Sequence, residues 1–255
     1  MKNYFITLLV IFIVNLCVAQ TNSYTWEKGG ITRFDQNEKN VYLVFTGHEY
    51  ADGADYICNI LKKNNIKASF FFTGDFYRNK KFKNIIKKLI ENKNYLGAHS
   101  DKHLLYCDWI NRDSTLISKD SFLIDIQNNY NAMSLFGIKK EKAKFFMPPF
   151  EWYNDTISKW ASDWGLQILN FSQGTLSIAD YTTPSMGKKY ISSDSIFRRI
   201  LSYEENSKNG LNGFILLLHI GTDPERTDKM YYKLNDLIIE LKRRGYKFKT
   251  MFDIK

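Results

Sequence analysis

Short apolar runs alternate with longer amphipathic segments along most of this chain. The apolar runs have strand length and are rich in β-branched and aromatic residues; they cover 41–45, 67–73, 95–98, 143–147, 166–170, 213–219 and 246–251. Segments with apolar residues at helical spacing lie between them, at about 56–63, 79–93, 119–135, 156–164, 197–204 and 228–244. This repeated strand-helix order, with strands that are apolar throughout, predicts an α/β fold with a parallel sheet.

The number of predicted strands bears on the shape of that sheet. About seven strands, without a glycine-rich dinucleotide fingerprint, favour a (β/α) barrel over an open nucleotide-binding sheet. Residues 20–39 are polar, contain Gly29 and Gly30, and are expected to form an irregular lead-in. We therefore expect one barrel domain over 40–255.

The first 19 residues have the pattern of a secretion signal. Lys2 precedes an apolar run from Tyr4 to Leu16, and Cys17-Val18-Ala19 is a small-x-small cleavage site before Gln20. The run is too short for a spanning helix, and no later segment is long enough. Cys17 also suggests a lipoprotein, but Leu16 fits a lipidation site poorly, so we favour cleavage after Ala19. The mature protein is then exported to the periplasm, the cell surface or the medium.

The net charge bears on which partners the protein binds, and the cysteines bear on whether it contains a disulfide. The formal net charge is +9, or +8 once Lys2 is removed with the signal. No basic tract interleaved with aromatic residues is present, so we expect a lysine-rich solvated surface rather than a nucleic-acid-binding face. After cleavage Cys58 and Cys107 remain; an exported protein allows a disulfide, but the apolar helical pattern around Cys58 favours a buried thiol.

The four histidines carry the clearest candidate chemistry. His99 and His103 are four residues apart, which in a helical turn places their Cβ atoms roughly 5–6 Å apart on one face. Two neutral imidazoles at that spacing can bind one divalent ion, with Ser100 and Asp101 orienting a ring or supporting the loop. His48 and His219 likewise follow or end apolar runs.

Other polar residues fall at the same places in the pattern. They follow predicted strands: Glu49 and Asp52 after the first, Asp75 after the second, Glu151 and Trp152 after the fourth, Asn170 after the fifth. In a barrel these strand ends meet on one face, where active sites are built. This regularity predicts one site that combines residues far apart in sequence.

These residues occur in motifs that resemble the polysaccharide deacetylase family, also called the nodulation-protein-B-like domain or carbohydrate esterase family 4. Residues 66–74 resemble its K-A-T-F-F-x-x-G strand, and 99–103 match its H-[ST]-x-x-H metal motif. Residues 148–150 resemble its R-x-P-[YF] element, and 217–219 match its L-x-H motif. The resemblance covers about 40–255 and implies a distorted (β/α) barrel.

The resemblance also implies an activity: metal-dependent removal of N- or O-acetyl groups from a polysaccharide or peptidoglycan, with zinc as the expected ion. It implies that His99 and His103 hold the metal and that His219 is the general acid for the leaving group. A bound ion polarises the acetyl carbonyl and lowers the pKa of a water molecule, and a base then removes the proton of that water.

The chain departs from the family at its first motif, T-F-D-D, where one Asp is the base and the other a metal ligand. Here the strand ends with Thr46 and Gly47, and the family's Arg before its Pro motif is Met147. Two hypotheses follow. The site is rebuilt, with His48 as third ligand and Glu49 or Asp52 as base or alternative ligand; or the barrel is catalytically inactive, keeps its metal and binds glycan.

Three further residues are candidates for substrate binding. Glu151 is a relocated base or a solvated loop carboxylate, and Trp152 stacks on sugar or packs at a helix start. Asp180 loosely matches the family region that shapes the acceptor site. Asp223 is a candidate to orient His219, or part of an ordinary turn. Asp75 is expected to cap a helix.

Overall fold

The computed structural model describes residues 24–254, so the predicted signal sequence and its cleavage site lie outside the described residues. The strands are β1 (Thr25–Glu27), β2 (Gly30–Arg33), β3 (Asn40–Gly47), β4 (Ser69–Phe72), β5 (Tyr95–Ala98), β6 (Phe145–Phe146), β7 (Gln167–Ile168), β8 (Phe214–His219) and β9 (Lys247–Lys249). The α-helices are α1 (Ala54–Lys63), α2 (Gly74–Arg78), α3 (Lys83–Glu91), α4 (Lys119–Ser134), α5 (Asp155–Asp163), α6 (Ser193–Asn206) and α7 (Leu234–Arg243).

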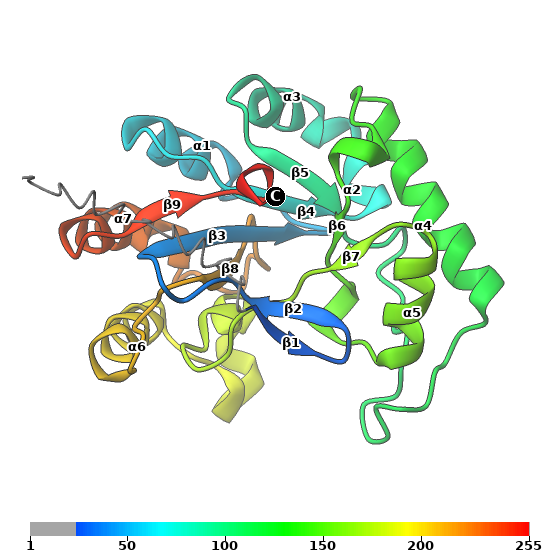
Figure 1. The fold of residues 1–255 in the computed structure, drawn as a ribbon. Helices are drawn as coiled ribbons and strands as arrows, with labels where there is room; N and C mark the ends of the chain where they lie inside the picture. Colours follow the sequence, from blue (N-terminus) through cyan, green and yellow to red (C-terminus); the bar gives the residue numbers. More distant parts are fainter. Residues whose placement is uncertain (1–23, 255) are drawn as a thin grey trace, which may run out of the picture.

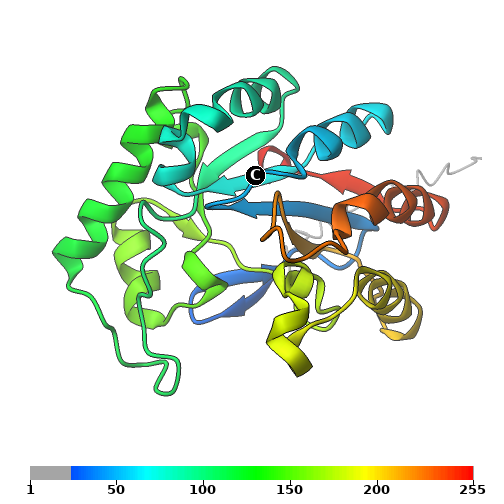
Figure 2. The same cartoon turned by 180° about the vertical axis from the view of Figure 1, so that it is seen from behind.

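The strands form one curled sheet in the order β1-β2-β8-β3-β4-β5-β6-β7, with β9 also paired to β3. All pairings among β3 to β9 are parallel, whereas β2 pairs antiparallel to both β1 and β8. Helices pack around the outside of the sheet (Figures 1 and 2). The predicted α/β class and the distorted barrel of about seven parallel strands are confirmed.

The two ends of the sheet meet at a single point. Ile31 of β2 forms a parallel bridge with Leu169, just after β7, and the Asn170 amide donates to the Ile31 carbonyl at 2.8 Å. This bridge closes the barrel. β1 and β2, rather than a further βα unit, therefore complete the wall.

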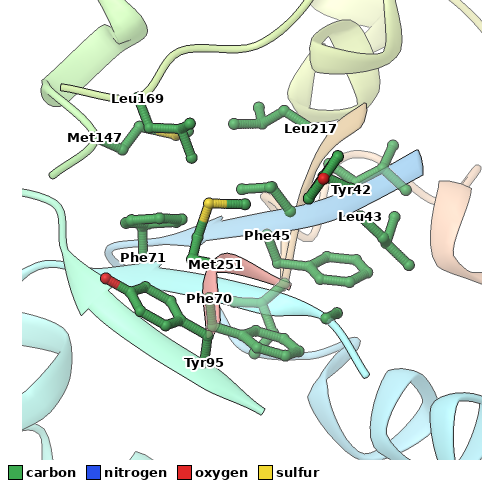
Figure 3. Close-up of a cluster of buried hydrophobic side chains, with 14 of the residues drawn as sticks. Tyr42, Leu43, Phe45, Phe70, Phe71, Tyr95, Met147, Leu169, Leu217 and Met251 are labelled. Carbon is green, nitrogen blue, oxygen red and sulfur yellow. The ribbon is translucent and has the colours of Figure 1, made fainter. Parts of the chain in front are cut away.

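The barrel core is built from strands that are buried on both faces. All residues of β4 and β5 are buried, as are Val41 to Gly47 of β3. Aromatic side chains from adjacent strands stack there: the rings of Phe45 and Phe70 lie 5.0 Å apart (Figure 3). This double burial explains why the strands appear in the sequence as uninterrupted apolar runs.

The expected irregular lead-in is wrong, because it contains the β1–β2 hairpin. Lys28 and Gly29 form its two-residue turn and both have positive φ, at 47° and 78°, as a type I′ turn requires. The short helix α2 was not predicted. It begins after Thr73, whose side chain accepts from the Phe76 amide, so Thr73 and not Asp75 is the cap.

Two smaller expectations concern cysteines and membrane spans. Cys58 and Cys107 are both buried free thiols, as predicted for Cys58. Within residues 24–254, no helix has the length and apolar character needed to cross a membrane.

Candidate active site

Three imidazole rings lie together at one end of the barrel. His48 follows β3 and His99 follows β5; both strands flank β4 and run parallel, so their carboxyl ends adjoin. The ring centroids of His48 and His103 are 4.9 Å apart and nearly parallel, and those of His99 and His103 are 5.0 Å apart. The structure thus brings together all three predicted metal ligands.

The segment from His99 to His103 achieves this without the helical turn that we expected. Ser100 and His103 have positive φ, at 71° and 55°, which makes the segment a tight loop. The Ser100 hydroxyl accepts from the His103 amide at 2.8 Å, and the Asp125 carboxylate accepts from the amides of Asp101 and Lys102. Ser100 therefore supports the loop, as predicted, while Asp101 is buried and pairs with Arg78 at 2.6 Å.

The chemistry of His99 and His103 fits a divalent ion. Burial lowers the pKa of His99 to about 3 and that of His103 to about 2, so both rings are neutral at pH 7. The Nδ1 atom of His99 lies 2.9 Å from the Met147 carbonyl, which fixes Nδ1 as the protonated nitrogen and leaves the Nε2 lone pair free. As they stand, no three His, Cys, Asp or Glu side chains among residues 24–254 form a complete ion-binding set.

Glu151 is the carboxylate nearest to this histidine pair. Its Oε1 lies 3.9 Å from His99 Nε2, and its side chain is 10% exposed. Burial raises the pKa of Glu151 to about 7, although the nearby His219 opposes that rise. Phe150 and Glu151 both have positive φ, 58° and 53°, a costly conformation for two consecutive non-glycine residues. The backbone is strained in a way that turns Glu151 inward, so it is not a solvated loop carboxylate.

His219 ends β8 beside β3, where it pairs in register with Thr46. Its Nδ1 lies 2.6 Å from Oδ1 of the buried Asp180, and its backbone amide donates to Oδ2 at 2.8 Å. Burial alone would lower the pKa of His219, but the Asp180 carboxylate outweighs it and the pKa is raised. Asp180 therefore orients the imidazole, with its oxygens occupied by His219 rather than presented to substrate.

Asp223, our candidate for that orienting role, contacts other groups. It accepts from the Tyr50 hydroxyl at 3.1 Å and from the Glu225 amide at 2.8 Å. The link between Asp180 and His219 spans 39 residues. The sequence points to Asp180 through the long polar segment 171–194 and its loose match to the family, but not to its contact with His219.

The two carboxylates predicted as bases lie apart from the buried part of the site. The side chain of Glu49 is 66% exposed, and its Oε1 is 3.9 Å from His48 Nε2. Asp52 accepts from the Thr222 amide and the Tyr231 hydroxyl and pairs with Lys229 at 3.0 Å. Asp52 thus ties the loop after β3 to the loop after β8.

The missing family carboxylates leave a distinct local structure. Thr46 has a buried hydroxyl without a hydrogen-bond partner among the described residues. A Cβ added at Gly47 would lie 2.8 Å from Ile220 Cγ2 and 3.0 Å from ring atoms of Phe72 and Phe76. Apolar side chains fill the space that an Asp at position 47 would need.

Comparisons with known proteins show the family to which the chain is similar. The family model described as polysaccharide deacetylase matches residues 34–169. The peptidoglycan-N-acetylmuramic acid deacetylase of Bacillus subtilis is 25% identical over 221 residues, covering 85% of this chain and 72% of that protein. The peptidoglycan-N-acetylglucosamine deacetylase of Bacillus cereus is 24% identical over 241 residues, covering 88% and 76%.

Solved structures show the same fold. The Bacillus subtilis family 4 carbohydrate esterase PdaA superposes with a TM-score of 0.68 at 21% identity, covering 89% of this chain and 85% of that one. A family 4 pseudoenzyme from Bacillus anthracis superposes with a TM-score of 0.66 at 21% identity, covering 90% and 69%. A mutant of that pseudoenzyme with restored enzymatic activity superposes with a TM-score of 0.65.

Proposed function

This chain belongs to the polysaccharide deacetylase family, and from that premise we propose that it is a metal-dependent hydrolase that removes N- or O-acetyl groups from a polysaccharide or peptidoglycan. The observation that carries the proposal is the union of a neutral histidine pair, an inward carboxylate and a separate Asp180–His219 pair at adjoining strand ends. A barrel that only binds glycan has no need of an imidazole held ready to donate a proton.

We assign the metal to His99 and His103, with His48 as third ligand and zinc as the expected ion. The two neutral rings and the free Nε2 of His99 support the pair. His48 Nδ1 lies 3.1 Å from the Thr73 hydroxyl, which leaves its Nε2 for the ion. Because no three such side chains among residues 24–254 form a complete set, the rings must shift when the ion binds. When bound, the ion would polarise the acetyl carbonyl and lower the pKa of a water molecule.

We assign the general base to Glu151, ahead of Glu49 and Asp52. Glu151 is buried beside His99, and its carboxylate accepts no hydrogen bond from residues 24–254, so it is free to take the proton of an attacking water. Glu49 is largely in solvent, and the oxygens of Asp52 are already occupied. The lost Asp at the first motif is replaced by a carboxylate from another strand end.

We assign the general acid to His219. Asp180 accepts from Nδ1–H, which leaves Nε2 as the nitrogen that donates to the leaving amine or alcohol. The same carboxylate favours the protonated ring, which is the form that an acid needs before the bond breaks.

The test combines two measurements. Acetate release is measured on acetylated glycans, and bound metal is measured by mass spectrometry. We expect Glu151→Gln to lower kcat by about 10²–10⁴-fold while bound metal is unchanged. His99→Ala should lose the metal. Glu49→Gln and Asp52→Asn are the matched controls; a loss of kcat in either of them, with Glu151→Gln still active, would move the base to that residue.

The first motif favours a second candidate function, an inactive glycan-binding barrel that keeps the metal. Thr46 and Gly47 supply no carboxylate, and the apolar contacts around Gly47 leave no space for one. If the protein, with metal bound, binds an acetylated glycan but releases acetate from none of the glycans tested, the result would establish this candidate and contradict the hydrolase.

We also propose that the protein is exported and acts on an acetylated glycan outside the cytoplasm. The signal-like pattern of residues 1–19 supports this, as do two relatives that are peptidoglycan deacetylases. Detection of a mature chain that begins at Gln20 in the periplasm, at the surface or in the medium is the direct check.

A further inference from the structure

The connection between β5 and α4 exposes large apolar side chains beside the candidate site. Trp109 is 54% exposed and Ile110 is 98% exposed. The connection is the long loop that hangs below the body of the molecule in Figure 1. Loops of this length in a compact domain are commonly functional. Exposed apolar side chains that lie next to one another on a surface mark binding sites.

This loop is held firmly by hydrogen bonds. The Asp108 carboxylate accepts from the amides of Ile110 and Asn111 at 2.8 and 2.7 Å. Arg112 donates to the Tyr153 carbonyl at 2.7 Å, and the backbones of Cys107 and Thr115 form an isolated antiparallel β-bridge. The loop therefore presents Trp109 in a fixed orientation, which lowers the entropy lost when a ligand binds.

A series of ring contacts connects Trp109 to the histidines. The indoles of Trp109 and Trp152 stack with centroids 5.6 Å apart, and the rings of Trp109 and Phe150 form a T-shaped pair with centroids 5.5 Å apart. Phe150, itself 42% exposed, lies 4.3 Å from the His103 ring. We call the rings of Trp109, Phe150 and Trp152 the aromatic platform; it starts at the proposed metal ligands and runs outward to solvent.

The members of the platform have different environments. Trp152 donates its Nε1–H to the Asp108 carbonyl at 3.1 Å, and the Arg112 guanidinium lies over its ring at 4.2 Å. Trp152 thus supports the platform from within. Trp109 and Phe150 are the rings that a ligand can reach.

We propose that the aromatic platform is a glycan subsite, on which a sugar next to the acetylated residue stacks against Trp109. The inference rests on the proposed function. A pyranose ring has an apolar C–H face that packs on an aromatic ring, while its hydroxyl groups stay in water. An amphipathic ligand of this kind fits rigid, half-exposed rings. The platform selects a polymer over a single acetylated sugar, because only a neighbouring residue reaches it.

The test measures binding by calorimetry in the presence of EDTA, so that no acetyl group is removed. The probes are the N-acetylglucosamine monomer and hexamer, peptidoglycan fragments and acetylated xylan oligomers. We expect at least one oligomer to bind, and Trp109→Ala to weaken that binding about five- to tenfold. Trp109→Phe should retain most of the affinity because it keeps a ring.

Trp26→Ala is the matched control, since Trp26 is 53% exposed on β1 outside the platform. Equal oligomer affinity in wild type and Trp109→Ala overturns the proposal, as does the absence of binding to every probe. Self-association or vesicle binding that depends on Trp109, seen by sedimentation, would assign the surface to another partner. Trp109-dependent binding in EDTA, combined with no acetate release from the same oligomer in a separate assay with metal present, would leave the subsite standing while the hydrolase fails.

Discussion

At the scale of single residues, the Asp180 carboxylate decides the charge of His219. Because Asp180 raises the pKa of a ring that burial alone would lower, we expect Asp180→Asn to lower that pKa. The protonated acid is then lost at lower pH, so the alkaline limb of the activity profile moves to lower pH. A titration of the His219 ring by NMR measures the change directly.

The same pair contributes to stability with a defined pH dependence. In the native protein the pKa of His219 is above its unfolded value, so the contribution is complete below pH 6.5 and is lost as the pH rises through the native pKa. Asp223→Asn, which removes an equal charge on the loop after β8, is the control. An unchanged His219 titration in Asp180→Asn would contradict the assigned pair.

Residue by residue, the sequence predicted the groups of the site better than their roles. The spacing of His99 and His103 was enough to predict that their rings lie close together, because two residues of one type at a fixed spacing are visible in the sequence alone. Glu151 points inward from a backbone in which both Phe150 and Glu151 have positive φ. Neither residue type favours positive φ, so the sequence does not predict this conformation. The loose match to the family's acceptor-site region predicts Asp180 as a substrate-binding residue, whereas its contact with His219 is formed only by the fold.

At the scale of elements, Arg226 organises the segment that carries Asp180. Its guanidinium is fully buried and donates to the carbonyls of Thr182 and Ile191 at 2.5 and 3.0 Å. We expect Arg226→Met to destabilise the protein by about 3 kcal/mol, because these buried carbonyls lose a charged donor. Urea denaturation measures the loss, and hydrogen exchange over residues 177–191 should rise.

Arg199→Met on the exposed face of α6 is the control, with an expected change within about 0.5 kcal/mol. If exchange over residues 177–191 were as slow in Arg226→Met as in the wild type, Arg226 would not be the residue that holds Asp180 in place.

Elements whose signal is local were predicted most closely. The strand at 95–98 has the predicted bounds, and α4 ends one residue before the predicted Leu135. The β1–β2 hairpin was missed because its strands have three and four residues, too few for a clear alternation. The turn at Lys28 and Gly29 is local, but the pairing of β2 with β8 joins Arg33 to Phe214, 181 residues further along the chain.

At the scale of the whole molecule, that hairpin closes the barrel, and Gly30 is the position that allows close packing there. A Cβ at Gly30 would lie 2.3 Å from the Tyr153 hydroxyl and 2.8 Å from Ile168 Cγ2. We expect Gly30→Ala to cost about 1–3 kcal/mol through overpacking, which lowers the Tm by about 2–4 °C per kcal/mol in a chain of this size. Calorimetry measures the shift.

The steric origin of this effect can be separated from a general weakening of the hairpin. Tyr153→Phe removes the hydroxyl that the new methyl group would strike, at the expense of its 2.9 Å bond to the Glu27 carbonyl. If the clash is the cause, the loss in the double variant is smaller than the sum of the two single losses. Strictly additive losses would assign the cost to the contacts that remain, with Tyr153 Cζ at 2.7 Å and Ile168 Cγ2 at 2.8 Å. Because Ile168 lies on β7, a confirmed clash would also show that close packing between β2 and β7, where the barrel closes, contributes to the stability of the protein.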